Sequence, residues 1–265
     1  MFSCGGILIN SVLLRSMVKF FIKISLFFAG FAAVYYFFRT SDFYTMRILA
    51  SDLGGAQWLY SSAGSIYGMI TAFVINQQWG QWNHLADSVK GEVDALDRLH
   101  RWANNFPDPI KEKVQGRVVK YLHLMIREGL HLSESGIRSQ AVEDALNQIE
   151  RSIFEMFDTN PDLVPTSFSI FSDILQARTD RIKYSTHRVP DILRFTLFFA
   201  ALILIGLSLF ISGKNIPISY VFTASVATLV YIIFLVIDDL NNPLKPGAWY
   251  ITSKDYKELL EKIER

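Results

Sequence analysis

The sequence is poor in the side chains that make disulfides and metal sites. Its 265 residues include a single cysteine, Cys4, which excludes an internal disulfide and any zinc site built on cysteines. The five histidines show no spacing of four that would place two of them together on a helix as metal ligands. Adjacent Asp238 and Asp239 could coordinate a cation, but two charges that mark a helix end are the plainer interpretation. We therefore expect neither a metal nor a cofactor.

Signature motifs of the common enzyme classes are also absent. The chain has no G-x-S-x-G, no G-x-G-x-x-G, no Walker phosphate loop and no H-E-x-x-H. Since no nucleophile, base or metal set is visible, we expect a protein that is not an enzyme.

Charged residues are scarce and nearly balanced. Asp, Glu, Lys and Arg make up 19% of the chain, against roughly 25% in soluble proteins. The formal net charge of +1 provides no broad basic surface, so nucleic acid is not an expected partner. Hydrophobic residues make up 51%, which indicates a membrane protein with the lipid bilayer as its surroundings.

Four stretches are long and apolar enough to cross a bilayer, which needs about 20 mostly apolar residues. They are residues 17–38, a stretch within 53–86, residues 195–212 and residues 216–237. The last two are separated by a very short loop, so they form an antiparallel hairpin. The run 53–86 holds no charged residue and as a helix would be about 50 Å long. It is therefore expected to cross the membrane and continue into water as one helix.

The first stretch has a second interpretation. Lys19 and Lys23 followed by an apolar run also resemble the start of a secretory signal peptide, and cleavage would leave three spans. We favour a span, because the aromatic residues 35–38 followed by Arg39 are typical of a membrane interface. Met17 is a further candidate start, which leaves open whether the first 16 residues belong to the mature protein.

Basic residues gather on one side of the predicted spans. They precede residues 17–38 and 195–212, whereas the loops on the other side hold few of them. By the positive-inside rule, the N-terminus, the middle region and the C-terminal tail are cytoplasmic. We expect an integral protein of a bacterial inner (plasma) membrane.

The middle region has the composition of a soluble helical segment. Apolar residues recur at helical spacing from Leu85 to Leu99, and the Pro-Asp-Pro of residues 107–109 ends that helix. Further helices are expected over residues 110–131, 140–157, about 166–188 and 254–264, with Thr166 and Ser253 as N-caps of the last two.

No strand-period alternation appears, so the predicted fold is all-α. It has four transmembrane helices and a helical cytoplasmic region inserted between spans two and three. The segments are 1–52 (N-terminal segment and first span), 53–86 (second span), 87–188 (cytoplasmic region), 189–238 (hairpin of spans three and four) and 239–265 (tail).

The second span carries two opposed stripes at 100° per residue. One is apolar and ends on a polar residue: Ile66, Ile70, Phe73 and Gln77. The other consists of small residues, which let helices approach closely in a membrane: Ser61, Gly64, Gly68 and Thr71. Either one stripe packs within the chain while the other faces lipid, or copies of this helix surround an axis and the apolar stripe forms a constriction. The sequence alone favours the first interpretation.

Short motifs between residues 67 and 247 resemble those of the bestrophin-like family. They are residues 67–74, Trp79, Trp82, Glu92, Leu96, Arg98, the segment 178–190 with Arg181, Ser185 and Pro190, and residues 239–247 at the exit of the last span. Leu244 departs from the family pattern, which has an aromatic residue after that proline. The resemblance covers about residue 55 to the C-terminus.

The resemblance implies a function by analogy with bestrophins proper, which are pentameric anion channels whose second membrane helix lines a neck. A homo-oligomer, a pentamer on this analogy, would pass small inorganic anions such as chloride. Its neck candidates are Ile66, Ile70 and Phe73.

Three arginines have two interpretations. Arg178, Arg181 and Arg188 could raise the local anion concentration near a cytoplasmic vestibule, or they only set the topology. The chain lacks the dense acidic cluster of calcium-gated bestrophins, so calcium gating is not expected. The alternative to a channel is a non-conducting membrane scaffold or sensor whose cytoplasmic helices bind a protein partner.

The orientation predicts which engineered cysteines an impermeant reagent reaches from outside. With Cys4 replaced by serine, cysteines near Asp42 and Lys214 should react, because both positions lie in loops on the side with few basic residues. A cysteine at Asn147 should react only after the membrane is opened. Labelling of that position in intact cells would contradict the four-span topology.

Overall fold

The computed structural model describes residues 56–129, 139–211 and 216–265, together with residues 18, 22–23, 25–31, 33–34 and 36–37. The chain divides into two compact units. The apolar unit comprises the chain up to Trp79, Arg188–Asn242 and Pro246–Trp249. The bundle unit comprises Gly80–His187, Pro243–Lys245 and Tyr250–Arg265.

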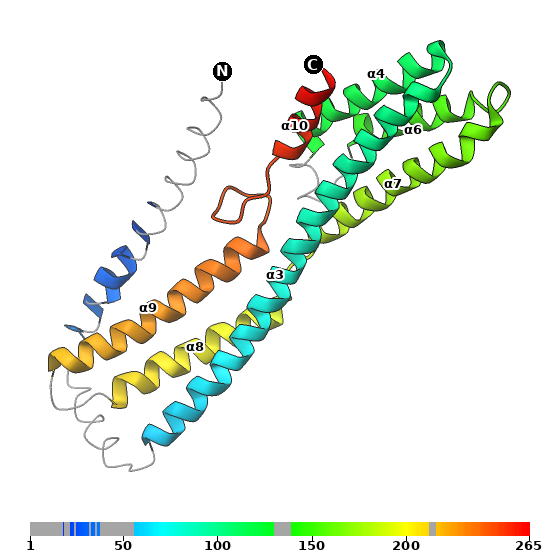
Figure 1. The fold of residues 1–265 in the computed structure, drawn as a ribbon. Coiled ribbons are helices and arrows are strands. Elements are labelled where there is room, and N and C mark those ends of the chain that lie inside the picture. Colours follow the sequence, from blue (N-terminus) through cyan, green and yellow to red (C-terminus); the bar gives the residue numbers. More distant parts are fainter. Residues whose placement is uncertain are drawn as a thin grey trace. The chain divides into compact units, whose positions relative to one another are not determined.

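All regular elements in the described ranges are helical (Figure 1), so the all-α class is confirmed. The elements are α3 (Ala56–Trp102), η1 (Ala103–Asn105), α4 (Asp108–Leu124), the π-helical η2 (Met125–Gly129), α6 (Gln140–Phe154), η3 (Pro161–Leu163), α7 (Val164–Thr186), α8 (Asp191–Ile211), α9 (Ile216–Asn241) and α10 (Lys254–Ile263).

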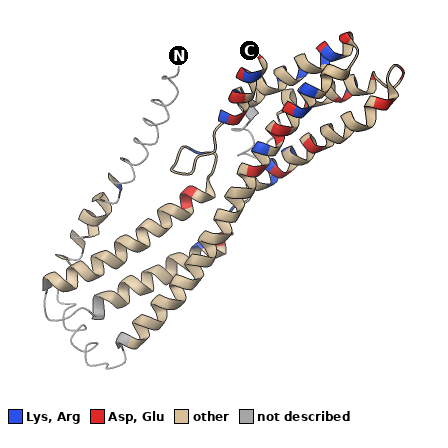
Figure 2. Ribbon diagram, in the orientation of Figure 1, with Lys and Arg blue, Asp and Glu red and all other residues tan. Residues whose placement is uncertain are grey.

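Three segments of the described residues are long and apolar enough to cross a membrane by length and composition: Trp58–Asn105, Pro161–Ser208 and Pro217–Asn241. They overlap the predicted second, third and fourth spans. Figure 2 shows the corresponding absence of charge along most of α8 and α9 and along the first part of α3.

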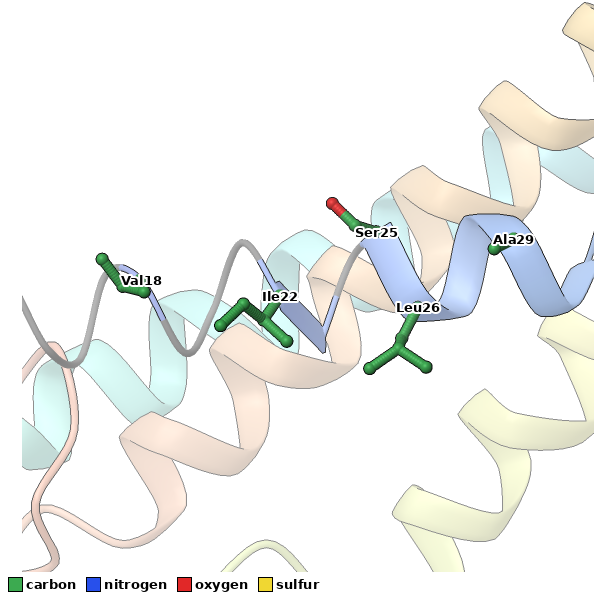
Figure 3. A pocket seen from close by; sticks show the side chains of 5 residues that line it. All are labelled: Val18, Ile22, Ser25, Leu26 and Ala29. Atoms are coloured by element: carbon green, nitrogen blue, oxygen red, sulfur yellow. The ribbon is translucent and has the colours of Figure 1, made fainter.

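Only part of the predicted first span, residues 17–38, lies within the described residues, so the count of four spans stays a prediction. The described positions are helical, and Phe27 stacks on Tyr231 of α9 with ring centroids 4.4 Å apart. An apolar hollow of about 460 Å³ is lined by side chains from this one stretch (Figure 3). They recur at helical spacing, as expected for a helix face: Val18, Ile22, Ser25, Leu26 and Ala29.

The apolar unit is built around the hairpin of α8 and α9, which lie side by side (Figure 1). The hydroxyl of Thr223 donates to the carbonyl of Ser208, 3.4 Å away, and so links the two helices. Leu197, Ala201 and Leu204 of α8 and Val230 of α9 share one core with Tyr67 and Val74 of α3.

The bundle unit surrounds the second half of α3. Leu85, Val89, Leu96 and Leu99 are buried at the spacing that the sequence predicted, because each turn of the helix returns an apolar side chain to the same face. The helices α4, α6, α7 and α10 supply the rest of this core.

The long helix α3 runs unbroken through Gly80, so the predicted continuity is confirmed. It ends at Trp102, where the 3-10 turn η1 leads to Phe106 in extended conformation and to Pro107. A proline at the second position of α4 costs no hydrogen bond there, because the first N–H groups of a helix have no partner within it.

Several predicted boundaries were wrong. Thr166 is not an N-cap: α7 already begins at Val164, with Leu163 as its N-cap residue and Pro165 in the first turn, where its fixed φ suits a helix. Ser253 is the N-cap residue of α10, as predicted, although its side chain makes no capping hydrogen bond.

Two other predicted helices differ from the structure: one changes its helical type, and the other ends earlier than predicted. The one expected over residues 110–131 changes to a π-helical turn after Leu124, and residues 130–138 lie outside the described part. The one expected over residues 140–157 ends at Phe154 and continues as turns.

Candidate functional site

One face of α3 is covered by its own chain within the apolar unit. Tyr67, Thr71, Val74 and Gln78 are buried. A Cβ added to Gly64 would lie 4.0 Å from the Cδ2 of Leu204, so this side of α3 lies close to α8. The helix therefore uses a face centred on Tyr67 and Thr71 to pack within the chain.

The opposite face of α3 is exposed in the single chain. Ile66 is 59%, Met69 74% and Phe73 68% exposed, and Gln77 is exposed as well. Ile70 lies at the edge of this face, partly buried against the core. The sequence analysis missed Met69, which lies one turn before Phe73 and on the same side.

The stripe of small residues is divided between the two faces. Gly64 is half-buried and Thr71 is buried, whereas Ser61 and Gly68 are exposed. A Cβ added to Gly68 would meet no described atom within 4 Å. Packing within the chain therefore accounts for Gly64 and Thr71 but gives no reason for the small size of Ser61 and Gly68.

A buried carboxylate in the bundle unit joins four helices. Glu92 of α3 is fully buried, and its Oε2 accepts hydrogen bonds from Arg181 Nε of α7 at 2.6 Å and from Tyr256 Oη of α10 at 3.0 Å. Its Oε1 accepts a hydrogen bond from Tyr121 Oη of α4. Since all four side chains are at most 2% exposed, this is an ion pair inside the protein with two added neutral donors.

The protonation states in this cluster follow from its geometry. Burial and then the neighbouring Glu92 carboxylate raise the pKa of both Tyr121 and Tyr256 well above the usual value, so both hydroxyls stay protonated donors. Burial by itself lowers the pKa of Arg181 and is the largest single influence on it. The charge of Glu92, its hydrogen bond to Arg181 and the two tyrosines together outweigh burial and raise that pKa. We call Glu92, Tyr121, Arg181 and Tyr256 the Glu92 cluster.

The predicted anion-attracting arginines have different surroundings. Arg181 belongs to the Glu92 cluster. Arg178 is also buried and pairs with Glu143 of α6 at 2.8 Å. Arg188, in the apolar unit, donates to the carbonyl of Asn241. Carboxylates thus compensate the charges of Arg178 and Arg181, and a role of the three arginines near a vestibule stays a prediction.

The carboxylate of Asp239 binds the backbone of the loop after α9. Its Oδ2 accepts hydrogen bonds from the N–H groups of Ala248 at 2.9 Å and Trp249 at 3.1 Å. A Cβ on Gly247 would lie only 1.8 Å from its Oδ1, so the loop needs glycine there.

In the described part of the chain, no three or more His, Cys, Asp or Glu side chains gather as a metal site.

Comparison with protein-family models identifies the family of the chain. A family model of the Bestrophin-like domain matches residues 52–246. The chain belongs to the bestrophin-like family. The resemblance drawn from its short motifs is confirmed, and the described α3, α8 and α9 are apolar helices of an integral membrane protein.

Solved structures of low sequence identity share the fold. A variant of a bacterial bestrophin homologue from Klebsiella pneumoniae matches with a TM-score of 0.66 at 11% identity, over 83% of this chain and 96% of that one. Another variant gives 0.65 at 12% identity, over 94% and 96%. A structure described as a membrane protein gives 0.63 at 12% identity, over 83% and 94%. No curated protein matches the sequence.

The Glu92 cluster predicts a stability contribution from α10. Replacing Tyr256 by Phe keeps the ring but removes a hydrogen bond to a charged acceptor, which should cost about 1.5–3 kcal/mol. The raised pKa of Tyr256 gives the sign of the pH effect: its stabilisation is complete below about pH 10 and is lost as the pH rises further, because only the unfolded chain then releases the proton.

Thermal unfolding in detergent, followed by circular dichroism between pH 8 and about 11, measures both effects. Tyr256→Phe should lower the midpoint and flatten its fall above pH 10. Tyr250→Phe is the control, because Tyr250 is half-exposed and lies outside the cluster. Equal behaviour of the two variants would contradict the assigned role of Tyr256.

Proposed function

We propose that this bestrophin-like protein is a homo-oligomeric, anion-permeable channel in which α3 of each copy lines the pore. Five copies are expected by analogy with bestrophins. The observation that carries the proposal is the mixed chemistry of the exposed face of α3, which fits neither a lipid-facing helix nor a helix buried within one chain.

The exposed face of α3 carries polar side chains along the predicted span. Interleaved with Ile66, Met69 and Phe73 are polar residues that are also exposed: Ser61, Ser62, Ser65, Asn76 and Gln77. In hydrocarbon such groups lose their hydrogen bonds with water. A face of this kind is therefore better explained by contact with water or with another copy of the helix.

The exposed face of α8 offers a comparison within the same unit. Its exposed side chains between Phe195 and Ile203 are apolar except for Thr196, whose hydroxyl donates to the carbonyl of Ile192 at 2.8 Å. That surface is typical of a helix that faces lipid. The difference between the two helices supports α8 at the periphery of the assembly and α3 at its axis.

Anion permeation is supported by the charge along α3 and by the family. No carboxylate occurs from residue 53 until Asp87, so a pore lined by this span has no acidic ring, which would favour cations. The apolar Ile66, Met69 and Phe73 would form a narrow segment that obstructs ions by excluding water.

Ion flux from purified protein in liposomes tests the proposal directly. Chloride and potassium gradients are applied in separate experiments. Chloride flux without comparable potassium flux supports an anion channel. Absence of both, from protein that is correctly assembled, would favour the scaffold or sensor.

Phe73 is expected to lie at or near the narrowest point. Replacing Phe73 by Ala should widen and wet the constriction and raise chloride flux severalfold. The fold of each chain should be kept, because the exposed ring makes little contact within its own chain, and the oligomer should stay intact if the ring is directed at the pore and not at a neighbouring copy. Phe195→Ala is the matched control, since Phe195 is exposed on α8 of the same unit. A Phe73→Ala protein that dissociates into monomers would show that this ring is a subunit contact.

Gly68 is expected to lie where neighbouring copies approach. Leucine at this position has open space in a single chain, but in a close helix contact it would act as a wedge and reduce oligomer recovery. Gly206→Leu is the control, because Gly206 of α8 also has open space around it. Light scattering coupled to size-exclusion chromatography gives the masses. An unchanged Gly68→Leu oligomer would remove this glycine from the interface.

A further inference from the structure

A polar pocket lies in the apolar unit where α8 begins and α9 ends. Its volume is about 500 Å³, and it is lined by residues 188–191, Arg194, Asn241 and Asn242. The channel proposed above makes no use of it.

The walls of the pocket are fixed by hydrogen bonds between segments far apart in sequence. Arg188 donates to the carbonyl of Asn241. The N–H of Val189 donates to Asn241 Oδ1 at 2.8 Å. The segment before α8 is thus tied to the last residue of α9, so the pocket is formed before any ligand enters and binding need not order its walls.

The charge of the pocket is cationic. Two of its lining side chains are guanidinium groups, those of Arg188 and Arg194, and Asp191 is the one carboxylate among them. Arg194 also approaches Asp238 at 3.5 Å, but both side chains are about half-exposed or more, and ion pairs of that kind are weak. The guanidinium of Arg194 can therefore turn to a bound anion at little cost. Guanidinium groups match the geometry of phosphate oxygens, which accept two parallel hydrogen bonds.

The pocket lies at the polar end of both hairpin helices. From Phe195 to the end of α8, and from the start of α9 to Ile237, neither helix carries a charge. If these two helices cross a bilayer, the hydrocarbon ends next to the pocket, at the depth of the lipid phosphates. We propose that the pocket binds a phosphate-bearing anion, namely the headgroup of an anionic phospholipid. The inference rests on the membrane-spanning hairpin of the proposed function and not on ion conduction.

Lipid retention by the purified protein tests this site. Native mass spectrometry of the assembled protein, titrated with dioleoyl phosphatidylglycerol, should detect one retained lipid per chain. Arg194→Gln should weaken that binding about tenfold, which corresponds to about 1.4 kcal/mol, while Arg194→Lys should restore part of it because the positive charge remains. Lys183→Gln is the matched control: it removes one positive charge from an exposed residue of α7 that does not line the pocket. Lipid binding is compared only between variants that have the same oligomer mass. A defect in folding or assembly is therefore not mistaken for weaker lipid binding.

Further arms identify the source of the anion. Displacement of the lipid by millimolar inorganic phosphate in the parent protein supports phosphate recognition and identifies a free anion as a second ligand, whereas retention supports the lipid. Equal weakening by Arg194→Gln and Lys183→Gln would overturn the site. So would binding of zwitterionic dioleoyl phosphatidylcholine to the parent protein as tightly as dioleoyl phosphatidylglycerol binds to it. Because no arm measures ion flux, a protein that retains the lipid but does not conduct overturns only the channel, and the reverse result overturns only the pocket.

Discussion

The carboxylate of Glu92 is the group on which the bundle unit depends. A buried charge without partners costs several kcal/mol, and Glu92 obtains its partners from three other helices: Tyr121 of α4, Arg181 of α7 and Tyr256 of α10. Each of these helices also buries apolar residues in the common core. The apolar contacts favour a compact bundle, while the carboxylate favours the register of each helix that brings its donor to Glu92, because a buried polar group left without a partner is costly.

Buried positions of α3 recur at seven-residue intervals in each of the two units. Thr71, Gln78, Leu85, Glu92 and Leu99 are all buried and follow one another at seven-residue intervals. A spacing of seven is close to two helical turns, with a drift of about 20° per interval, so within each unit neighbouring buried positions lie on nearly the same side of the helix. In the predicted span the opposite side stays exposed. Two constraints therefore act on one helix: its covered side meets the folded chain, and its exposed side is left for water, lipid or other copies.

The sequence predicted those features that depend on neighbouring residues. The extent of α3, the turn at Pro107 and the hairpin of α8 and α9 follow from local periodicity, proline and apolar length. The partners of Glu92 did not follow, because Arg181 lies 89 residues away and Tyr256 164 residues away. The division of the small stripe, with Thr71 covered and Gly68 exposed, depends on the direction from which α8 approaches, which no pattern within α3 specifies.

The arginines before α8 bear on two properties, the membrane topology and the attraction of anions. They contribute to the first more than to the second. Topology is decided as the chain inserts, and the positive-inside rule counts basic residues whatever acidic residues accompany them. Arg178 and Arg181 therefore contribute to it fully. Attraction of an anion depends instead on the potential of the folded protein, in which the half-buried carboxylate of Glu143 and the buried carboxylate of Glu92 offset those two charges. The cationic groups left at the end of the hairpin are Arg188 and Arg194, so an anion that approaches this end of the apolar unit meets them first.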